Sequence, residues 1–470
     1  MVAQQLADLV RLRTLRPGDR LPSVRRLSRE RDVSVATAVA AYLQLEADGV
    51  VESRPRSGYF VRRDAGVDPE AVRHRALPQG GPARVSISPG MAALVHAMQD
   101  STVLALGATI LAPELLPLRA LNRMLSALAR GSATAGVSYG PVRGVVTLRR
   151  QLARRSAAWG TTLHEQSLLI TVGAMEALVL ALRAVTAPGD VVAVESPSYF
   201  GVLQILDMLA LRALEIPCRP ETGLDVDALA AALGRTPIRA VVASPTVHNP
   251  LGARMPDEQK QRLVRLLARH DVPLVEDDVY GDLAFDGTRP TPAQAFDRGG
   301  RVMLCGSISK TLAPGYRVGW LTTGRYAERI ERLKFAQTVA TPALPQMAVA
   351  EFLASGRYDR HLRRLRRLLG AQVRRFRETA ALTFPAGTTF SQPEGGFFLW
   401  AELPRAVDSL SLQTEALRHR IAIAPGPIFS ASKGLRNCLR LSCGMPWSRR
   451  VERALTTIGE LAHAQLRRRA

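Results

Sequence analysis

Short apolar runs alternate with stretches of helical periodicity from Ser86 to the end of the chain. The runs have the length of strands and are rich in valine, leucine and isoleucine: Leu168–Val172, Val191–Val194, Ala240–Ala243, Pro273–Val275 and Val302–Leu304. Strands that alternate with helices assemble into a mostly parallel sheet with helices packed on its faces. The pattern therefore predicts an α/β domain over residues 86–470.

The first 63 residues follow a different pattern, in which short helical segments precede two short strands. Ser23 is placed to cap a helix whose apolar face is formed by Val24 and Leu27, because a serine hydroxyl accepts a hydrogen bond from the first helical turn. The opposite face is expected to point outward and carries three arginines, Arg25, Arg26 and Arg29.

A second helix is predicted from Val35 to Asp48, with Ser34 as its cap and Gly49 as its end. We expect its buried stripe to consist of Val39, Tyr42 and Leu43. Two short helices joined by a tight turn form a helix-turn-helix, and the second helix of such a unit can enter the major groove of DNA.

A hairpin is predicted after these helices. Its strands are Val50–Ser53 and Tyr59–Val61, and its tip is basic and contains a glycine. A hairpin of this kind can lie along phosphates as a wing. The tip residues are Arg54, Pro55, Arg56, Ser57 and Gly58.

Residues 64–85 are rich in proline, glycine and charge and show no sustained period, which is typical of a linker. The sequence thus divides into a helix-turn-helix domain at residues 1–63, a linker at 64–85 and the α/β domain from 86 to 470.

The charge balance permits a polyanionic partner, since 63 lysines and arginines stand against 41 acidic residues, a net charge of +22. The four cysteines, Cys218, Cys305, Cys438 and Cys443, form no C-x-x-C pair, so we expect isolated core thiols, with neither a metal site nor a disulfide framework. No apolar run of about 18 residues and no signal-peptide core are present. A cytoplasmic protein without a membrane span is therefore expected.

The segment Cys305 to Lys310 follows a predicted strand and ends in a lysine, and Arg317 lies seven residues further on. Ser307 and Ser309 add two hydroxyls. An amine, two hydroxyls and a guanidinium that converge after one strand suit an aldimine formed beside a phosphate group. Together with Ala313–Gly319, this segment resembles the lysine segment of the aspartate-aminotransferase-like proteins. The resemblance implies pyridoxal 5′-phosphate as the cofactor, with Lys310 as the residue that forms the Schiff base.

Pyridoxal phosphate also requires an acid at its pyridine nitrogen, donors at O3′, an anion cradle and an aromatic face. Asp277 and Asp278 both follow a strand, and adjacent side chains at a strand end point in opposite directions, so either could be the acid. Tyr280 lies three residues beyond Asp277. Gly173, Ala174 and Met175 pass from a strand into a helix, whose N-terminus favours an anion.

Three further segments complete the set: Ser244–Gly252 with Asn249, Ser196–Tyr199, and Cys438–Ser442 with Arg440. Taken in order over residues 86–446, these segments resemble the fold-type-I, class I and II aminotransferases. The resemblance implies a large domain and a small C-terminal domain at about 340–470. It also implies that Lys310 is the catalytic lysine.

The same resemblance assigns the remaining roles. Asp277 is the acid and Tyr280 the phenol at O3′, Asn249 donates to O3′, and Tyr199 stacks on the ring. Arg440 grips a substrate α-carboxylate, a bidentate task for which lysine is poorly suited. Tyr139, in the segment Tyr139–Gly144, reaches the phosphate of a neighbouring subunit, which implies a homodimer. Leu251 replaces the usual threonine of the family, and His248 is expected to be a turn residue rather than a base.

The N-terminal segments PGDRLPSVRRLS, VSVATAV, AYLQLEADGV and ESRPRSGYFV resemble the GntR-type winged helix over about residues 3–61. The family commonly places arginines early in the recognition helix, where this chain has Val35, Ala36 and Val39. Contacts with DNA are therefore expected from the remaining polar groups, Arg25, Ser34, Thr37, Arg54, Arg56, Ser57 and Gly58.

A winged helix followed by an aminotransferase-like domain resembles the MocR subgroup of GntR regulators. The resemblance implies a transcription regulator that binds double-stranded DNA at a promoter and that senses pyridoxal phosphate or an amino compound. The alternative is a working aminotransferase in which Lys310 moves the proton and the N-terminal module is secondary.

Overall fold

The computed structural model describes residues 2–11, 14–15, 18–54, 58–62, 80–85, 89–131 and 134–469. The predictions for Arg56, Ser57 and residues 64–79 of the linker fall outside these residues. Within the described part of the chain, no helix is both long and apolar enough to cross a membrane.

The N-terminal module consists of α1 (Val2–Arg11), α2 (Val24–Glu30), α3 (Val35–Ala47) and an antiparallel pair, β1 (Val51–Arg54) and β2 (Gly58–Val61). Both predicted caps are present. The Ser23 hydroxyl accepts a hydrogen bond from the amide of Arg26 at 3.3 Å, and the Ser34 hydroxyl accepts one from the amide of Thr37 at 3.0 Å. The predicted helix-turn-helix with a hairpin wing is thus confirmed in its described part.

The prediction for the buried face of α3 was wrong at two of three positions. Tyr42 is fully buried, stacked on Tyr59 and bonded to the carbonyl of Pro22, but Val39 and Leu43 are exposed. The inner residues of α3 follow the helical spacing of three and four residues and are Ala38, Ala41, Tyr42 and Leu45. Two of these are alanines, so the larger aliphatic residues drew the prediction to the wrong face.

The α/β domain is built around a nine-stranded sheet with the order β3-β7-β6-β9-β10-β11-β12-β5, and β8 pairs with β7. The four neighbouring pairs from β7 to β11 are parallel, whereas β12 is antiparallel to both of its neighbours. The predicted strands are confirmed as β5 (Leu168–Thr171), β6 (Val191–Ser196), β9 (Ile238–Ala243), β10 (Leu274–Asp277) and β11 (Val302–Ser307). The others are β3 (Ala83–Arg84), β7 (Arg212–Arg219), β8 (Gly223–Leu224) and β12 (Gly319–Thr322).

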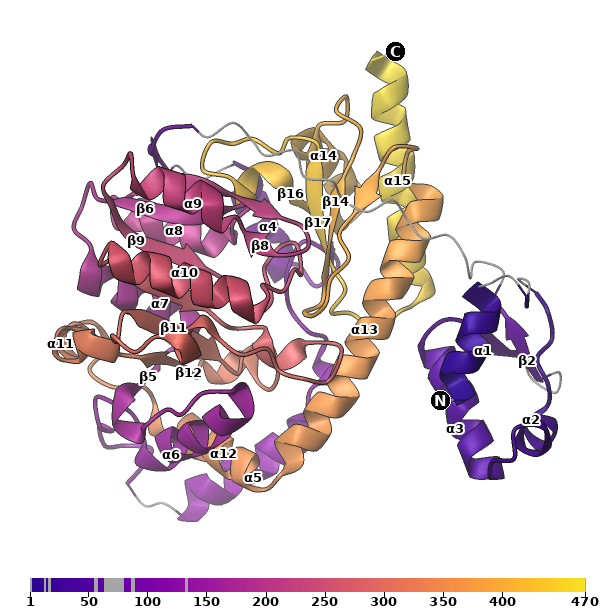
Figure 1. The fold of residues 1–470 in the computed structure, drawn as a ribbon, viewed down its shortest axis with the longest axis horizontal. Coiled ribbons are helices and arrows are strands. Elements are labelled where there is room, and N and C mark those ends of the chain that lie inside the picture. The colour runs from indigo at the N-terminus through magenta and orange to yellow at the C-terminus, as the bar shows by residue number, and fades with distance from the viewer. Residues whose placement is uncertain are drawn as a thin grey trace.

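Alternate residues of each strand enter different hydrophobic clusters, which explains the helices on both faces. Val192 and Val194 of β6 pack with the helices α7 (Gly173–Val185) and α8 (Phe200–Met208). Ala193, between them, packs on the side of α9 (Val226–Leu233) and α10 (Asp257–Arg269). Figure 1 shows the sheet with these helices around it.

One boundary of the predicted linker differs from the structure. Ala83 and Arg84 form β3, which pairs with β7 at the edge of the large sheet, and Val85 is buried against the same cluster as α7. The last residues of the segment expected to be a linker therefore belong to the α/β domain.

The small domain contains a four-stranded antiparallel sheet with the order β13-β14-β17-β16. Its strands are β13 (Thr389–Phe390), β14 (Phe398–Glu402), β16 (Ala424–Pro425) and β17 (Cys438–Ser442), and its helices are α13 (Arg357–Thr383), α14 (Ser409–Arg418) and α15 (Arg449–Arg469). A two-stranded parallel pair, β4 (Leu104–Ala105) with β15 (Ile421–Ala422), joins it to the start of the domain.

The expected start of the small domain near residue 340 was too early. Helix α12 (Ala343–Ala354) packs with α5 (Leu118–Gly131) and α6 (Val146–Ser156), and its Val349 and Phe352 lie in the core of the large domain. In contrast, helix α4 (Pro89–Gln99), near the start of the α/β domain, contacts β16 of the small domain. The first and last parts of the α/β domain are therefore folded together.

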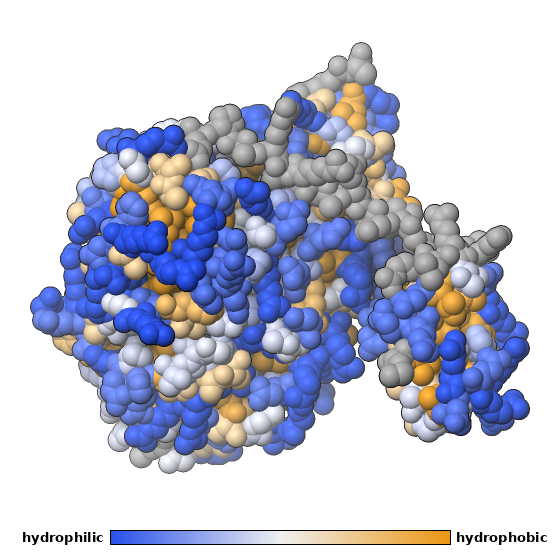
Figure 2. All heavy atoms as spheres, viewed as in Figure 1, coloured by the Kyte–Doolittle hydropathy of each residue, from blue (hydrophilic) through white to orange (hydrophobic). Residues whose placement is uncertain are grey.

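The N-terminal module lies beside α13 of the small domain (Figure 1). Arg374 of α13 is 3.1 Å from a carboxylate oxygen of Asp48, and Glu378 is 4.0 Å from Arg62. The buried core of the module is formed by its own residues alone, among them Leu6, Leu27, Tyr42 and Val61. The described contact between the two parts includes these two ion pairs, and Figure 2 shows that hydrophilic residues cover most of the visible surface of the molecule.

Candidate functional site

A cavity of about 190 Å³ lies at the carboxyl edge of the large sheet. In open α/β sheets this edge is where ligands bind. The lining residues come from the ends of five strands and from α7: Ala174, Met175, Leu178, Tyr199, Asn249, Asp277, Val279, Tyr280, Ser307, Ser309, Lys310 and Arg317. The structure thus brings together residues that are far apart in sequence, and Leu178 and Val279 are the two that the sequence analysis did not name.

Lys310 places its amine inside this cavity. Its Nζ donates a hydrogen bond of 2.6 Å to the carbonyl of Thr109. Burial and, next, the nearby Arg440 lower the pKa of Lys310 from 10.5 to about 8, although Asp277 acts in the opposite direction. A lysine with a lowered pKa is a better nucleophile near neutral pH because more of it is unprotonated.

The structure separates Asp277 from Asp278. Asp277 lines the cavity, whereas Asp278 accepts a hydrogen bond of 2.6 Å from Thr246 and pairs with the buried Arg289. The reason is strand alternation, since Asp277 shares a face with Val275 and the cluster beside α7. This geometry supports Asp277, and not Asp278, as the acid of the site.

The carboxylate of Asp277 has a buried oxygen to which no described residue donates a hydrogen bond. Burial and, next, the charge of Asp278 raise its pKa to about 7. Its buried Oδ1 has no hydrogen-bond partner among the described residues. Buried acceptors are normally satisfied, so a protonated ring nitrogen of a bound molecule would complete this site.

The residues expected to hold a phosphate surround the other end of the cavity. The hydroxyls of Ser307 and Ser309 are 2.7 Å apart, and Arg317 donates a 3.4 Å hydrogen bond to Ser309. Gly173 has a φ of +76°, and a β-carbon at this position would collide with the guanidinium of Arg317. The glycine therefore lets Arg317 and the start of α7 approach the same anion.

Arg440 is completely buried beside the lysine. It donates hydrogen bonds to Asn249 at 2.9 Å and to the carbonyl of Gly107 at 2.7 Å, and its guanidinium lies over the rings of Phe200 and Phe429. Burial lowers its pKa to about 10. Its Nε has no partner among the described residues and remains available for a carboxylate. The pairing of Arg440 with Asn249 was not foreseen from the sequence.

Two tyrosines line the cavity as expected. Burial raises the pKa of Tyr199 to about 12 and raises that of Tyr280 further, so both remain neutral phenols. Tyr280 packs edge-on against Phe397 and Phe398, which fixes its ring. Tyr139, in contrast, is 88% exposed and does not line the cavity.

A buried cluster next to the site was missed by the sequence analysis. The Nε2 atom of His248 is 3.4 Å from Glu195 and 3.9 Å from the sulfur of Cys218, and all three side chains are buried. The His248 Nδ1 accepts a hydrogen bond from the amide of Leu251, so the ring proton belongs on Nε2, facing Glu195. Burial raises the pKa of Glu195 to about 8. His248 is thus a turn residue, as predicted, that also orients its neighbours.

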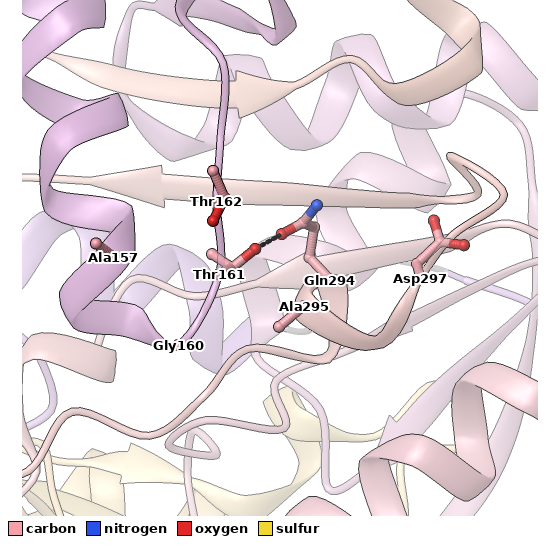
Figure 3. Close-up of a pocket in the computed structure, with 7 residues that line it drawn as sticks. All are labelled: Ala157, Gly160, Thr161, Thr162, Gln294, Ala295 and Asp297. Atoms are coloured by element: carbon pink, nitrogen blue, oxygen red, sulfur yellow. Dashed lines mark hydrogen bonds between the residues drawn. The ribbon is translucent and has the colours of Figure 1, made fainter.

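A second hollow has the features of a surface depression rather than a site (Figure 3). It lies between the end of α6 and the turn at Gln294, and Thr161 and Gln294 are joined across it by a hydrogen bond of 3.0 Å. Its single carboxylate, Asp297, accepts hydrogen bonds from the amides of Gly299 and Val302 and is therefore engaged in its own loop.

The residues expected to contact DNA are exposed where the structure describes them. Arg25 lies on the outer face of α2, Ser34 and Thr37 are at the start of α3, and Gly58 begins β2 with a φ of +97°. Arg54 is paired with Glu52 at 2.7 Å and lies over the ring of Phe60. A phosphate contact by Arg54 would therefore compete with an existing ion pair.

Fold and cavity together define the class of the protein: a winged helix-turn-helix joined to an α/β domain of fold type I that carries a pyridoxal-phosphate site. Residues 114–458 match the family model described as aminotransferase class I and II, and residues 1–61 match bacterial regulatory proteins of the gntR family.

Two relatives from Escherichia coli K12 align over almost the whole chain. The uncharacterized HTH-type transcriptional regulator YjiR is 38% identical over 98% of both chains, and the uncharacterized HTH-type transcriptional regulator YdcR is 37% identical over 99% of both. The solved structure of the α-aminoadipate aminotransferase LysN from Thermus thermophilus, complexed with N-(5′-phosphopyridoxyl)-L-leucine, is similar with a TM-score of 0.75. It is 28% identical, and the match covers 82% of this chain and 96% of that one.

The chain therefore belongs to the class I and II aminotransferase family, in the MocR-type subgroup of GntR regulators that carry a winged helix before this domain.

Proposed function

We propose that this protein is a transcription regulator that binds promoter DNA through its winged helix and responds to an amino compound bound with pyridoxal phosphate at Lys310. One observation carries the proposal: a winged helix-turn-helix with its own core and a pocket lined by the residues expected to bind the cofactor occur in one chain. The alignment with YjiR and YdcR over both parts supports it.

The residues of the pocket have distinct tasks in this proposal. Lys310 attaches the cofactor, Asp277 holds the ring nitrogen, and Ser307, Ser309 and Arg317 hold the phosphate. Pyridoxal phosphate supplies an aldehyde carbon and an electron-withdrawing ring when it is bound. Arg440 binds the carboxylate of the amino compound through its free Nε, in a water-poor environment where a charged hydrogen bond is strong.

The protein is also proposed to act as a homodimer. Tyr139 and Val137 are almost fully exposed, and Phe335 and Val339 add exposed apolar surface at the end of α11 (Ala327–Thr338). Exposed apolar residues of this size often mark an interface. Sedimentation at micromolar concentration should give a dimer, and Tyr139→Ala should weaken cofactor binding while leaving the dimer intact. A monomer that binds the cofactor tightly contradicts this part of the proposal.

DNA binding tests the regulatory role directly. The full-length protein should protect two half-sites in the region upstream of its own gene, and an amino compound should change that protection only when pyridoxal phosphate is present. Replacement of both Arg54 and Arg56 should weaken binding to all sequences and flatten its salt dependence, because phosphate contacts are lost. Binding to the upstream region no better than to random duplex, with and without cofactor, contradicts the proposal.

A second function, transamination, is favoured by the position of Lys310. Its amine is held beside both Asp277 and Arg440, an arrangement that serves proton transfer as well as binding. Mixing of the loaded protein with single amino acids, followed by absorbance, separates the two functions. Multiple turnovers with a keto-acid acceptor would show an aminotransferase, whereas a stable spectral change without turnover fits a sensor.

A further inference from the structure

The outward face of α3 is apolar along most of its length. Val35 is 52% exposed, Val39 37% and Leu43 54%, and the exposed Ala36 and Ala40 lie between them. Residues 36, 40 and 43 follow the spacing of one helix face, and Val35 and Val39 border that face. Exposed aliphatic side chains in this number on a helix of 13 residues indicate a surface that meets a partner.

This face lacks the groups that usually distinguish bases. Guanine is read most often by arginine or lysine and adenine by asparagine or glutamine, and residues 33–43 include none of these. The two hydroxyls at the start of α3 are engaged with each other, because Ser34 and Thr37 share a 2.8 Å hydrogen bond and Ser34 also caps the helix. The first turns of α3 therefore lack the side chains that usually read a base through two hydrogen bonds.

We propose that α3 recognises thymine 5-methyl groups in the major groove, with Val35, Ala36 and Val39 as the contacting residues. This proposal rests on the proposed DNA-binding function and specifies its partner chemistry. The thymine methyl is the apolar group that base pairs present in the major groove, and it is normally contacted by small aliphatic side chains. The N-terminal residues of a recognition helix are the ones that reach base edges.

The surroundings of this face favour a nucleic acid as its partner. Arg25 and Arg29 are exposed on α2, and no carboxylate of the described residues pairs with either of them, whereas Arg26 is bonded to Glu30. Exposed positive side chains on α2, which packs against α3, suit a phosphate backbone that borders a groove. The arginines would position the module, and the aliphatic face would select the sequence.

Helix geometry limits the spacing of the thymines. Val35 and Val39 are four residues apart, or about 6 Å along the helix axis, and base steps are about 3.4 Å apart. A helix lying along the groove therefore places these two side chains near thymines about two base pairs apart. Each half-site is expected to contain a thymine pair with this spacing.

Deoxyuridine, which lacks only the 5-methyl group, provides the test. The full-length protein with pyridoxal phosphate is used to select duplexes from a random library, and the enriched duplex is resynthesised with deoxyuridine at one thymine at a time. Replacement of one contacted thymine by deoxyuridine should lower the affinity of the protein for the duplex roughly fourfold, as expected for the loss of one buried methyl group. Thymines outside the half-sites should show no loss.

Protein variants separate the thymine contact from other effects. The double variant Val35→Ser, Val39→Ser should bind the thymine duplex more weakly and should no longer distinguish it from the deoxyuridine duplex. Arg25→Gln is the matched control, which should bind both duplexes more weakly by the same factor.

Two failures have different meanings. Specific binding with equal affinity for the thymine duplex and for a duplex fully substituted with deoxyuridine overturns the thymine contact alone. Selection that enriches no sequence overturns the proposed DNA-binding function as well.

Discussion

Lys310 is one of only four lysines in the chain, so its role can be tested with little interference. Lys310→Ala should abolish the covalent adduct left after borohydride reduction and the visible absorbance of the cofactor, because no other described lysine lines the cavity. Lys433→Ala is the matched control, since Lys433 is exposed and should leave both signals unchanged. An unaltered adduct in the Lys310 variant would exclude the assignment.

The pH dependence of cofactor attachment reports on the same side chain. Only the unprotonated amine can attack an aldehyde, and the pKa of Lys310 is lowered to about 8. The attachment rate should therefore rise about tenfold per pH unit below pH 8 and level off above it, whereas an ordinary lysine would continue to rise to about pH 10.

Variants of Arg440 test what lowers the pKa of Lys310. Because its positive charge contributes to the low pKa of Lys310, Arg440→Gln should move the profile to higher pH, and Arg440→Lys should not. Stopped-flow absorbance of the apoprotein mixed with the cofactor gives both profiles. A profile that is unchanged in Arg440→Gln contradicts this electrostatic account.

At the residue scale, the sequence predicted best where a side chain belongs to a motif next to a strand end. Lys310, Ser307 and Asp277 are examples, because strand ends of a parallel sheet meet at one edge. The groups that bond to these residues were not predictable in the same way. Thr109 and Gly107 contribute carbonyl oxygens, which every residue has, and only the fold brings them to Lys310 and Arg440.

At the scale of elements, the junction between β5 and α7 depends on Gly173. Its left-handed φ disfavours any other residue by about 1–2 kcal/mol, and a methyl group would also press on Arg317. Gly173→Ala should therefore lower the affinity for pyridoxal phosphate at least tenfold and also destabilise the domain.

Gly189 offers a control with the same backbone but without the contact. Its φ is +91°, and a β-carbon at this position would have no atom within 4 Å. Gly189→Ala should destabilise the domain to a similar degree, measured by thermal unfolding, and leave cofactor affinity unchanged, measured by fluorescence titration. Equal loss of affinity in both variants would show that Gly173 acts through stability alone.

The elements that the sequence analysis named were placed to within a few residues, but the buried face of α3 was not predicted correctly. A face is chosen by what packs against it, and here Tyr59 of β2 and Leu27 of α2 select Ala38 and Tyr42. The expectation that larger aliphatic residues are buried fails here, because Val39 and Leu43 are exposed whereas the alanines of α3 are buried. Val39 and Leu43 instead lie on the exposed face of α3 that is proposed above to contact DNA.

At the scale of the whole molecule, two separate cores predict two separate unfolding events. The core of the module is formed by its own residues, such as Leu6, Tyr42 and Val61. Its described contact with α13 includes the ion pairs of Asp48 with Arg374 and of Arg62 with Glu378, and partly exposed ion pairs contribute little to stability. Calorimetry should show two transitions, and pyridoxal phosphate should raise only that of the α/β domain, because a ligand stabilises the unit that binds it. A single transition that shifts as a whole contradicts independent folding.

The arrangement of the parts could not be read from the sequence. The strand β3, the pair of β4 with β15 and the contact of Asp48 with Arg374 each join segments that are distant along the chain. These pairings depend on how the chain returns on itself, and two-residue strands carry no periodic signal of their own. Domain order was predictable, whereas the exact borders required the fold.

The self-contained core of the module also makes it exchangeable. A winged helix from another protein could replace it without leaving a cavity in the α/β domain, provided that the side chains corresponding to Asp48 and Arg62 are kept for α13. In the proposed function, such a chimera would bind the promoter of the protein that donated the winged helix. It would respond to the ligand of the protein that donated the α/β domain, so DNA specificity and ligand specificity could be exchanged separately.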